Sequence, residues 1–287
     1  MCKVTQMAQK ARNNFNPGWL PDYAKAFGNP GLSVLAFWLG SLFAQKIRDK
    51  QRTFPILELT GCPASGKSTV TEFCWKLVGK QDYEGFAFGL SSHAAIRRVL
   101  NAANMPVVSI ETDLGSPFNF EQYKSLYNGR TPFVCAKADS SGELEDQQFR
   151  GTLMIQQVEK VNGSPALQSR MVNVHMDKLH HNQDTFETAR WCERQTVNDL
   201  GGFLPLSLLN EKQILKTYFT AFANLEAAFT ARGARNGRVI KNHTQIAALV
   251  QALPVIFPNF TDDILPDFTN YMINRTIICE ARISEGS

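Results

Sequence analysis

The sequence predicts an α/β fold in which a parallel sheet is sandwiched between helices. Short apolar runs alternate with helical patterns through the middle of the chain, which is typical of β-α-β units. From Thr185 onward the pattern is helical only. The 287 residues are 44% hydrophobic and 20% charged, as in an ordinary globular protein of one large or two small domains. We therefore predict three parts: a helical N-terminal segment (1–50), a core (51–182) and a C-terminal helical lid (183–287).

The elements follow in order along the chain. After two Asn-Pro-Gly turn signals, residues 33–48 read as an apolar helix that leads into a buried strand at 54–60. Residues 69–77 continue as a helix, and Ser91 and Ser92 are suitable N-caps for another helix that reaches residue 102. Further strands are predicted over 105–110, 131–137, 152–157 and 172–176, and further helices over 120–127 and 166–170.

The turn between the first strand and its helix carries the strongest chemical signal. Residues 61–68 read Gly-Cys-Pro-Ala-Ser-Gly-Lys-Ser, which fits the G-x-x-x-x-G-K-[ST] phosphate loop in its required strand-to-helix setting. Main-chain N–H groups and the helix dipole would hold a polyphosphate, while the Lys67 ammonium would reach its outer phosphates and the Ser68 hydroxyl would complete a Mg²⁺ shell. The predicted nucleotide contacts are Gly61, Pro63, Ala64, Ser65, Gly66, Lys67, Ser68 and Thr69.

Hydrolysis needs a carboxylate near Mg²⁺ and an activated water. The strand at 105–110 ends in Glu111-Thr-Asp113, where such acids are expected. We assign Glu111 to the metal and Asp113 to the water, although the Glu-Thr-Asp order leaves this division open. Gln156, at the end of the strand at 152–157, is a candidate for holding the attacking water or sensing the γ-phosphate.

Two arginines are candidates for completing the site. Arg170 ends a short predicted helix and could act as a finger in a neighbouring subunit's site. Arg238 opens a helix in the tail and could touch nucleotide from the lid, although a solvated helix start is the commoner role for such a residue. Residues 133–139 superficially match a guanine-reading motif, but Ala136 stands where Asn is needed, which leaves ATP as the expected nucleotide.

Charge, cysteine and apolar patterns bear on location and partners. Residues 1–52 hold eight Lys/Arg and two Asp/Glu, so a net +6. This basic segment is equally compatible with binding to an anionic polymer and with being a solvated leading segment of the chain. The six cysteines show no metal spacing and read as reduced thiols of a cytoplasmic protein. The apolar stretch at 32–44 is too short to cross a bilayer, so no membrane partner is expected.

Five segments, taken together and in this order along the chain, carry a resemblance to a known family: 54–77, 82–85, 91–113, 127–130 and 149–170. In that combination the chain resembles the ATPase/helicase module attached to toprim-type primases of phages and mobile elements, within the AAA+ and superfamily 3 group. The resemblance covers roughly residues 30–250. It implies a ring-forming, DNA-dependent ATPase with five parallel strands, as a homo-oligomer that is most often a hexamer.

By that resemblance Glu111 and Asp113 fall on the second acidic motif, Gln156 on the first sensor and Arg170 on the arginine finger. The chain departs from the family pattern where Gln replaces the commoner Asn or Thr sensor, and where the acidic pair is not Asp-Glu. The chain carries no recognisable primase domain, so a primase is a possible partner. The sequence thus predicts an ATP- and Mg²⁺-dependent helicase that acts on single-stranded or forked DNA.

Two alternatives remain open at this stage. One is a nucleotide switch or defence-type ATPase that acts on a protein partner. The other is a phosphotransferase, since small-molecule kinases share the same loop.

Overall fold

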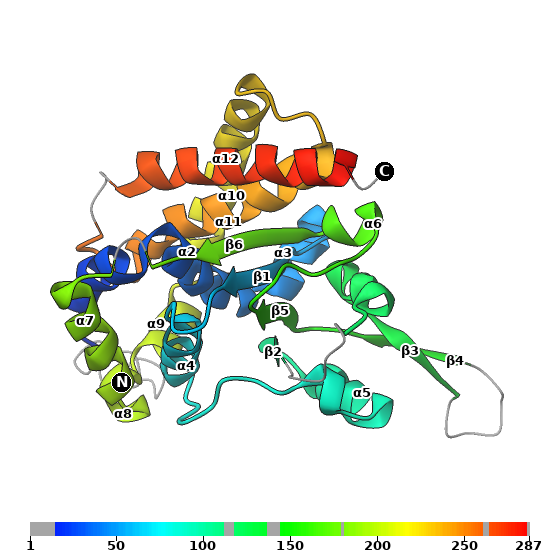
Figure 1. The fold of residues 1–287 in the computed structure, drawn as a ribbon, viewed down its shortest axis with the longest axis horizontal. Coiled ribbons are helices and arrows are strands. Elements are labelled where there is room, and N and C mark those ends of the chain that lie inside the picture. The colour runs from blue at the N-terminus through cyan, green and yellow to red at the C-terminus, as the bar shows by residue number, and fades with distance from the viewer. Residues whose placement is uncertain (1–14, 112–117, 137–143, 179–180, 261–263, 286–287) are drawn as a thin grey trace.

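The computed structural model describes residues 15–111, 118–136, 144–178, 181–260 and 264–285 (Figure 1). Asp113, one of the two predicted catalytic acids, lies outside these residues. The architecture is mixed α/β, with a four-stranded parallel sheet flanked by helices.

The sheet has the strand order β2-β5-β1-β6, and all its pairs are parallel. Each strand is almost wholly buried, as expected where helices cover both faces of a parallel sheet. Because the strands are parallel, their carboxyl ends share one edge and their amino ends the other, and the two edges become chemically different. The strands are β1 Ile56–Gly61, β2 Pro106–Ile110, β5 Thr152–Gln157 and β6 Met171–Met176.

Only four of the five parallel strands implied by the resemblance form in the described chain. In place of a fifth, Phe86 makes an isolated parallel bridge to Ser109, beyond the β2 edge. The predicted strand at 131–137 does form, as β3 (Arg130–Ala136), but it pairs antiparallel with β4 (Leu144–Gln148) outside the main sheet. This two-stranded ribbon projects from the body of the molecule (Figure 1).

The predicted helix at 33–48 is two helices. α2 (Leu20–Ser41) begins earlier than predicted and runs past Gly28, whose φ of 57° marks a kink, and α3 (Ala44–Gln51) follows after a break. No single helix in the described chain is long and apolar enough to cross a membrane; only the bent pair Pro17–Ser41 and Ala44–Gln51, at 84° to each other, meets the length and composition needed. Most of the apolar residues of α2 are buried in the protein core.

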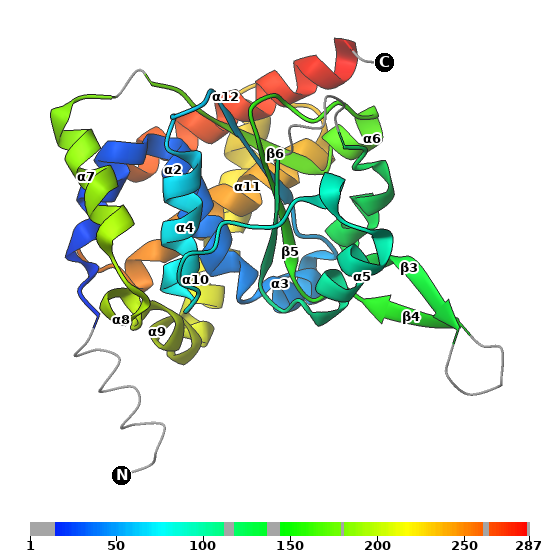
Figure 2. The same cartoon turned by 60° about the horizontal axis from the view of Figure 1, so that its bottom comes forward.

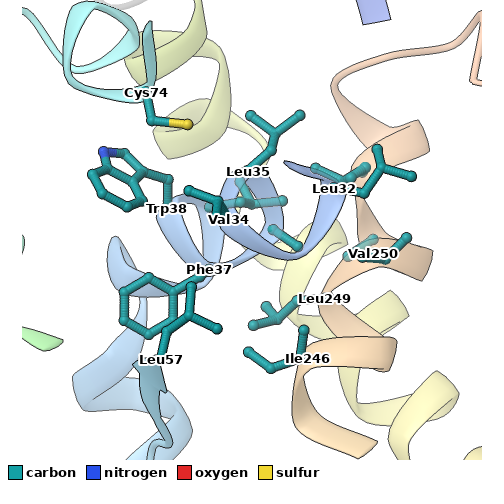
Figure 3. Packing of buried hydrophobic residues seen from close by; sticks show 14 of the residues in the cluster. Leu32, Val34, Leu35, Phe37, Trp38, Leu57, Cys74, Ile246, Leu249 and Val250 are labelled. Carbon is teal, nitrogen blue, oxygen red and sulfur yellow. The ribbon is translucent and has the colours of Figure 1, made fainter. Parts of the chain in front are cut away.

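Two apolar clusters cover the two faces of the sheet. On one face, side chains such as Leu57 and Val174 pack with α2, α4 (Lys67–Leu77) and α11 (Gly237–Ala252), as Figure 3 shows for Leu57, Trp38 and Leu249. The other face packs with α5 (His93–Ala102) and the 3₁₀ helix η3 (Glu121–Asn128). Figures 1 and 2 show α10, α11 and α12 stacked beyond α2 and β6. The C-terminal helices thus share one core with the sheet.

The remaining elements agree with the predicted helical tail, which is interrupted near Gly201 and Gly233. The other α-helices are α5 His93–Ala102, α6 Pro165–Gln168, α7 Gln183–Arg194, α8 Val197–Leu200, α9 Phe203–Leu209, α10 Glu211–Ala231 and α12 Ile264–Glu285. The 3₁₀ helices are η1 Pro17–Trp19, η2 Phe88–Leu90, η3 Glu121–Asn128 and η4 Leu253–Val255.

Candidate functional site

The predicted phosphate loop joins the carboxyl end of β1 to the first turn of α4. Gly61 can only be glycine, because a Cβ there would lie 2.2 Å from the Met176 carbonyl oxygen of the neighbouring strand. Gly66 has a φ of 93° and Ala64 a φ of 59°, left-handed conformations of the kind that occur in anion-binding nests. The Ser65 hydroxyl is buried and has no hydrogen-bond partner among the described residues. The loop therefore fits a polyphosphate.

Lys67 lies folded back over this loop. Its ammonium donates hydrogen bonds to the carbonyl oxygens of Gly61 and of Cys62, the latter at 3.0 Å. Partial burial lowers the pKa of Lys67, while the Cys62 thiol and the carboxylates of Glu111 and Glu84 oppose that shift. A bound triphosphate would replace these neutral carbonyls with a much stronger anionic acceptor.

Glu84 is an acid of the site that the sequence patterns did not single out. Its carboxylate accepts a hydrogen bond from the Gln156 side-chain amide, and the Gln156 carbonyl in turn accepts one from the Thr71 hydroxyl of α4 at 2.6 Å. Gln156 is buried. The Trp75 indole N–H donates to the Glu84 main-chain carbonyl at 2.8 Å, which holds the loop that carries this acid.

Gly85 explains how that loop reaches the sheet. A Cβ at Gly85 would lie 2.6 Å from the Val108 carbonyl oxygen, so the chain passes against β2 only with glycine at this position. The preceding residue is thereby delivered to the carboxyl edge of the sheet, beside Gln156 at the end of β5. In the sequence, the signal that could have indicated this role is that Glu84 directly precedes Gly85.

Glu111 follows β2 at the same edge. It is exposed, and its carboxylate accepts a hydrogen bond from the Val158 N–H at 2.8 Å, which fixes it beside the end of β5. Ser68, the other predicted Mg²⁺ ligand, is exposed in the first turn of α4. In the described part of the chain no group of three or more His, Cys, Asp or Glu side chains could hold a metal ion. The donor set fits Mg²⁺ that keeps substrate phosphates and water as its other ligands.

A cavity of about 500 Å³ opens directly beside the loop. Its walls come from the loop, from the start of α2 and from α7, including Ala64, Thr69, Phe27, Phe186 and Ala189. The Thr69 hydroxyl donates to the Glu193 carboxylate of α7 at 3.1 Å, so α7 is tied to the loop helix. The cavity has the size and the partly aromatic lining of a small-molecule site.

The structure places both predicted arginines at the opposite edge of the sheet. The Ile56 N–H donates to the Arg170 carbonyl, so Arg170 is level with the amino end of β1. Ile56 to Gly61 is six residues of strand, so five steps or about 17 Å. The Arg238 guanidinium donates to the Ser169 hydroxyl at 3.0 Å, beside Arg170. Arg238 therefore lies away from the phosphate loop of its own copy.

No carboxylate in the described chain forms an ion pair with either arginine. The Arg170 guanidinium packs over the Tyr127 ring, 5.7 Å from its centroid, and its Nε has no hydrogen-bond partner among the described residues. Burial lowers the pKa of Arg170, and the adjacent Arg238 lowers it further, while Tyr127 and the Glu121 carboxylate oppose the shift. Two guanidiniums held together in this way favour an anion from outside the chain.

Comparison with known proteins gives a match among solved structures. No protein-family model and no curated protein matches the chain. Among solved structures, the protein described as "SCCmec type IV Cch - active helicase" is similar over 90% of this chain, with a TM-score of 0.65 and 15% sequence identity. This chain spans 50% of the length of that protein. The likeness shows a shared fold: the α/β architecture found here is also that of a helicase.

Proposed function

We propose that this chain is an ATP-hydrolysing motor that acts on DNA as a ring of identical subunits, of the helicase type. One observation carries the proposal: a phosphate loop with its acids lies at the carboxyl edge of the sheet, while the unpaired arginines lie at the amino edge. The hydrolytic site is then complete only where the carboxyl edge of one copy meets the arginines of another.

At the carboxyl edge each polar group has a separate role. The loop and Lys67 bind the triphosphate, and Ser68 and Glu111 hold Mg²⁺, which screens the phosphate charge. Gln156 and Glu84, joined by their hydrogen bond, position the attacking water and accept its proton. Asp113 remains a second candidate for that base. The cavity beside the loop receives the nucleoside.

At the amino edge Arg170 acts towards the neighbouring copy. A side chain of ordinary length cannot bridge about 17 Å within one chain, so its guanidinium stabilises the transferred phosphoryl group of an adjacent site. Arg238, beside it, acts in the same direction. An interface that joins two different surfaces repeats from copy to copy and closes into a ring when the rotation allows.

DNA is proposed as the substrate on two grounds. The fold is shared with a protein described as an active helicase. The first 52 residues carry a net charge of +6, which suits a polyanion.

The test is complementation between two inactive variants. Lys67→Ala removes the phosphate contact and Arg170→Ala removes the donated guanidinium, so each alone is expected to lose ATPase activity, the latter with nucleotide affinity kept within about threefold. In a random mixture about a quarter of the interfaces pair an intact loop with an intact arginine. ATPase activity is therefore expected to return on mixing, with particle mass measured on the same sample.

Each failure has a distinct meaning. Inactive mixtures that still assemble would show that both residues act within one copy, which contradicts the shared site. Full activity of Arg170→Ala alone would remove Arg170 from the mechanism. ATPase activity that single-stranded DNA does not change would count against DNA and favour a protein partner.

A further inference from the structure

A second polar cavity, of about 610 Å³, lies between α3, η3 and the base of the β3–β4 ribbon. It is at the amino edge of the sheet, away from the phosphate loop. Three arginines contribute to its lining: Arg48 and Arg52 from the end of α3, and Arg130 from the start of β3. Asp49 is the one acid among the described lining residues, so the lining carries a net charge of +2.

Arg48 is the fixed part of the cavity wall. Its side chain is buried, yet it forms no ion pair among the described residues. The guanidinium donates to the carbonyl oxygens of Phe149 at 3.3 Å and Leu126 at 3.2 Å, and it lies 5.6 Å from the centroid of the Phe149 ring. Burial lowers the pKa of Arg48 to about 10, so the group is still a cation at neutral pH.

Two buried donors in this wall lack acceptors. The Arg48 Nε–H and the Ser125 hydroxyl have no hydrogen-bond partner among the described residues. A buried donor without an acceptor is costly, and an unneutralised buried cation more so. The wall therefore favours a ligand that supplies both acceptor oxygens and negative charge.

Arg52 and Arg130 add exposed positive charge to the lining. Both side chains are exposed, so they can close over a ligand without a rearrangement of the core. Arg52 has a φ of 67°, a left-handed conformation that is uncommon for residues other than glycine. The Asn128 side-chain amide donates to the Arg52 carbonyl at 3.1 Å and ties this turn to η3. The backbone is thus held where it brings Arg52 to the cavity.

We propose that this cavity binds a phosphate group, at a site separate from the phosphate loop. Phosphate matches the wall because its tetrahedral oxygens accept from several guanidiniums at once, with a bidentate contact to each. Free phosphate species and the backbone phosphates of a nucleic acid share this chemistry. The cavity is larger than one phosphate, so it also admits an adjoining sugar.

The direct test follows the arginine Nε–H resonances of the full chain by NMR while inorganic phosphate is added. The Arg48 signal, identified by its loss in Arg48→Lys, is expected to shift saturably. In the double variant Arg52→Gln/Arg130→Gln, which leaves the core intact, the phosphate affinity should fall about tenfold or more. Arg194→Gln removes an exposed arginine from α7, far from the cavity, and should change nothing.

The Lys67→Ala variant separates this site from the phosphate loop. The Arg48 shift should persist in Lys67→Ala at the same phosphate concentration. If the shift disappears with Lys67, or if Arg48 and Arg194 signals respond alike with no saturation, the proposed site is overturned. This NMR experiment does not depend on the ATPase proposal, because it uses no nucleotide and measures no turnover.

A second arm identifies the source of the phosphate, and it rests on the proposed action on DNA. Binding of an oligothymidylate is measured against salt concentration by fluorescence anisotropy. If the cavity holds backbone phosphate, the double variant Arg52→Gln/Arg130→Gln, which lacks two positive charges, should show a smaller slope of log Kobs against log[salt]. The expected reduction is about 1.4, at about 0.7 per phosphate. An unchanged slope with lost inorganic phosphate binding would assign the cavity to a free phosphate species.

Discussion

The two edges of the central sheet carry opposite chemistry. At the carboxyl edge the acids Glu84 and Glu111 act on Lys67, which is already hydrogen-bonded to carbonyls of its own loop and also has Lys178 nearby. At the amino edge the described charges are mainly guanidiniums: Arg48, Arg52, Arg130, Arg170 and Arg238. A parallel sheet creates this separation, since every strand presents its end groups to the same side.

The two sets of charges are separated along the strands of the sheet. About 17 Å of strand separates the two sets, so neither can reach the other within one molecule. Under the proposed function, a phosphate bound at the loop lacks, within its own copy, the arginines that would stabilise charge during its transfer. The proposal therefore makes each edge complementary to the opposite edge of another copy.

The largest expected effect concerns the acids of the carboxyl edge. Glu84→Gln keeps the size and a hydrogen bond to Gln156 but removes the negative charge. If Glu84 accepts a proton from the attacking water, the ATPase turnover rate should fall about 10²- to 10⁴-fold while ATP affinity changes little. Steady-state ATPase assays and equilibrium nucleotide binding measure the two quantities.

Two matched variants sharpen this result. Glu111→Gln should also reduce turnover, with a changed dependence on Mg²⁺ concentration, because Glu111 is assigned to the metal. Glu226→Gln removes an exposed acid of α10 and should have no effect. Normal turnover in Glu84→Gln would return the role of base to Asp113 and reduce the Glu84–Gln156 bond to a structural contact.

Apolar patterns predicted the sheet well because its strands are buried on both faces. The strand at 152–157 was predicted with its observed bounds, and the strands at 105–110 and 172–176 within one residue. Ser92 caps α5 as expected, since its hydroxyl accepts from the Ala95 N–H. These are local or two-sided properties that a single sequence expresses directly.

Features that depend on tertiary contacts could not be predicted from the sequence. Glu84 lies in an irregular loop, and only the close approach of Gly85 to β2 brings it to Gln156. β4 has the polar sequence Leu-Glu-Asp-Gln-Gln, so no apolar pattern marks it as a strand. Arg238 was assigned to a lid over the nucleotide, but the packing of α11 on α2 and β6 places it beside Ser169.

The second prediction tests how the buried core around α11 tolerates another proton. His243, on the helix that carries Arg238, is buried, and its pKa is lowered to about 4 by burial, with a smaller contribution from Arg275. Its ring Nδ1–H donates to the Val239 carbonyl at 2.8 Å. The folded state therefore holds His243 neutral where the unfolded chain, with a pKa near 6.5, takes up a proton.

The direction of the pH dependence of stability follows from the difference between the pKa values of His243 in the folded and unfolded states. Above pH 6.5 the ring is neutral in both states, so it imposes no pH dependence there. As pH falls from about 6.5 to about 4, proton uptake by the unfolded state should remove about 3 kcal/mol of folding free energy. Urea unfolding at several pH values measures this. His243→Gln should flatten that part of the pH curve, and an equal slope in both proteins would contradict the assigned cause.

The smallest expected effect separates the nucleoside from the phosphates at the carboxyl edge. Phe186 lines the cavity beside the loop, is 53% exposed, and has the Arg190 guanidinium 4.4 Å from its ring centroid. If the base of ATP stacks on this ring, Phe186→Ala should weaken ATP binding about tenfold, since base stacking contributes about 1–3 kcal/mol. Isothermal titration calorimetry measures the change.

Inorganic tripolyphosphate is the matched ligand for this test, because it has the phosphates of ATP and no base. Its affinity should be the same in Phe186→Ala as in the unaltered chain, since Lys67 and the loop amides are untouched. Leu208→Ala, which removes a side chain of 52% exposure on α9, should affect neither ligand. Equal losses for ATP and tripolyphosphate would mean that Phe186 shapes the loop through α7, and the nucleoside would then have to lie elsewhere.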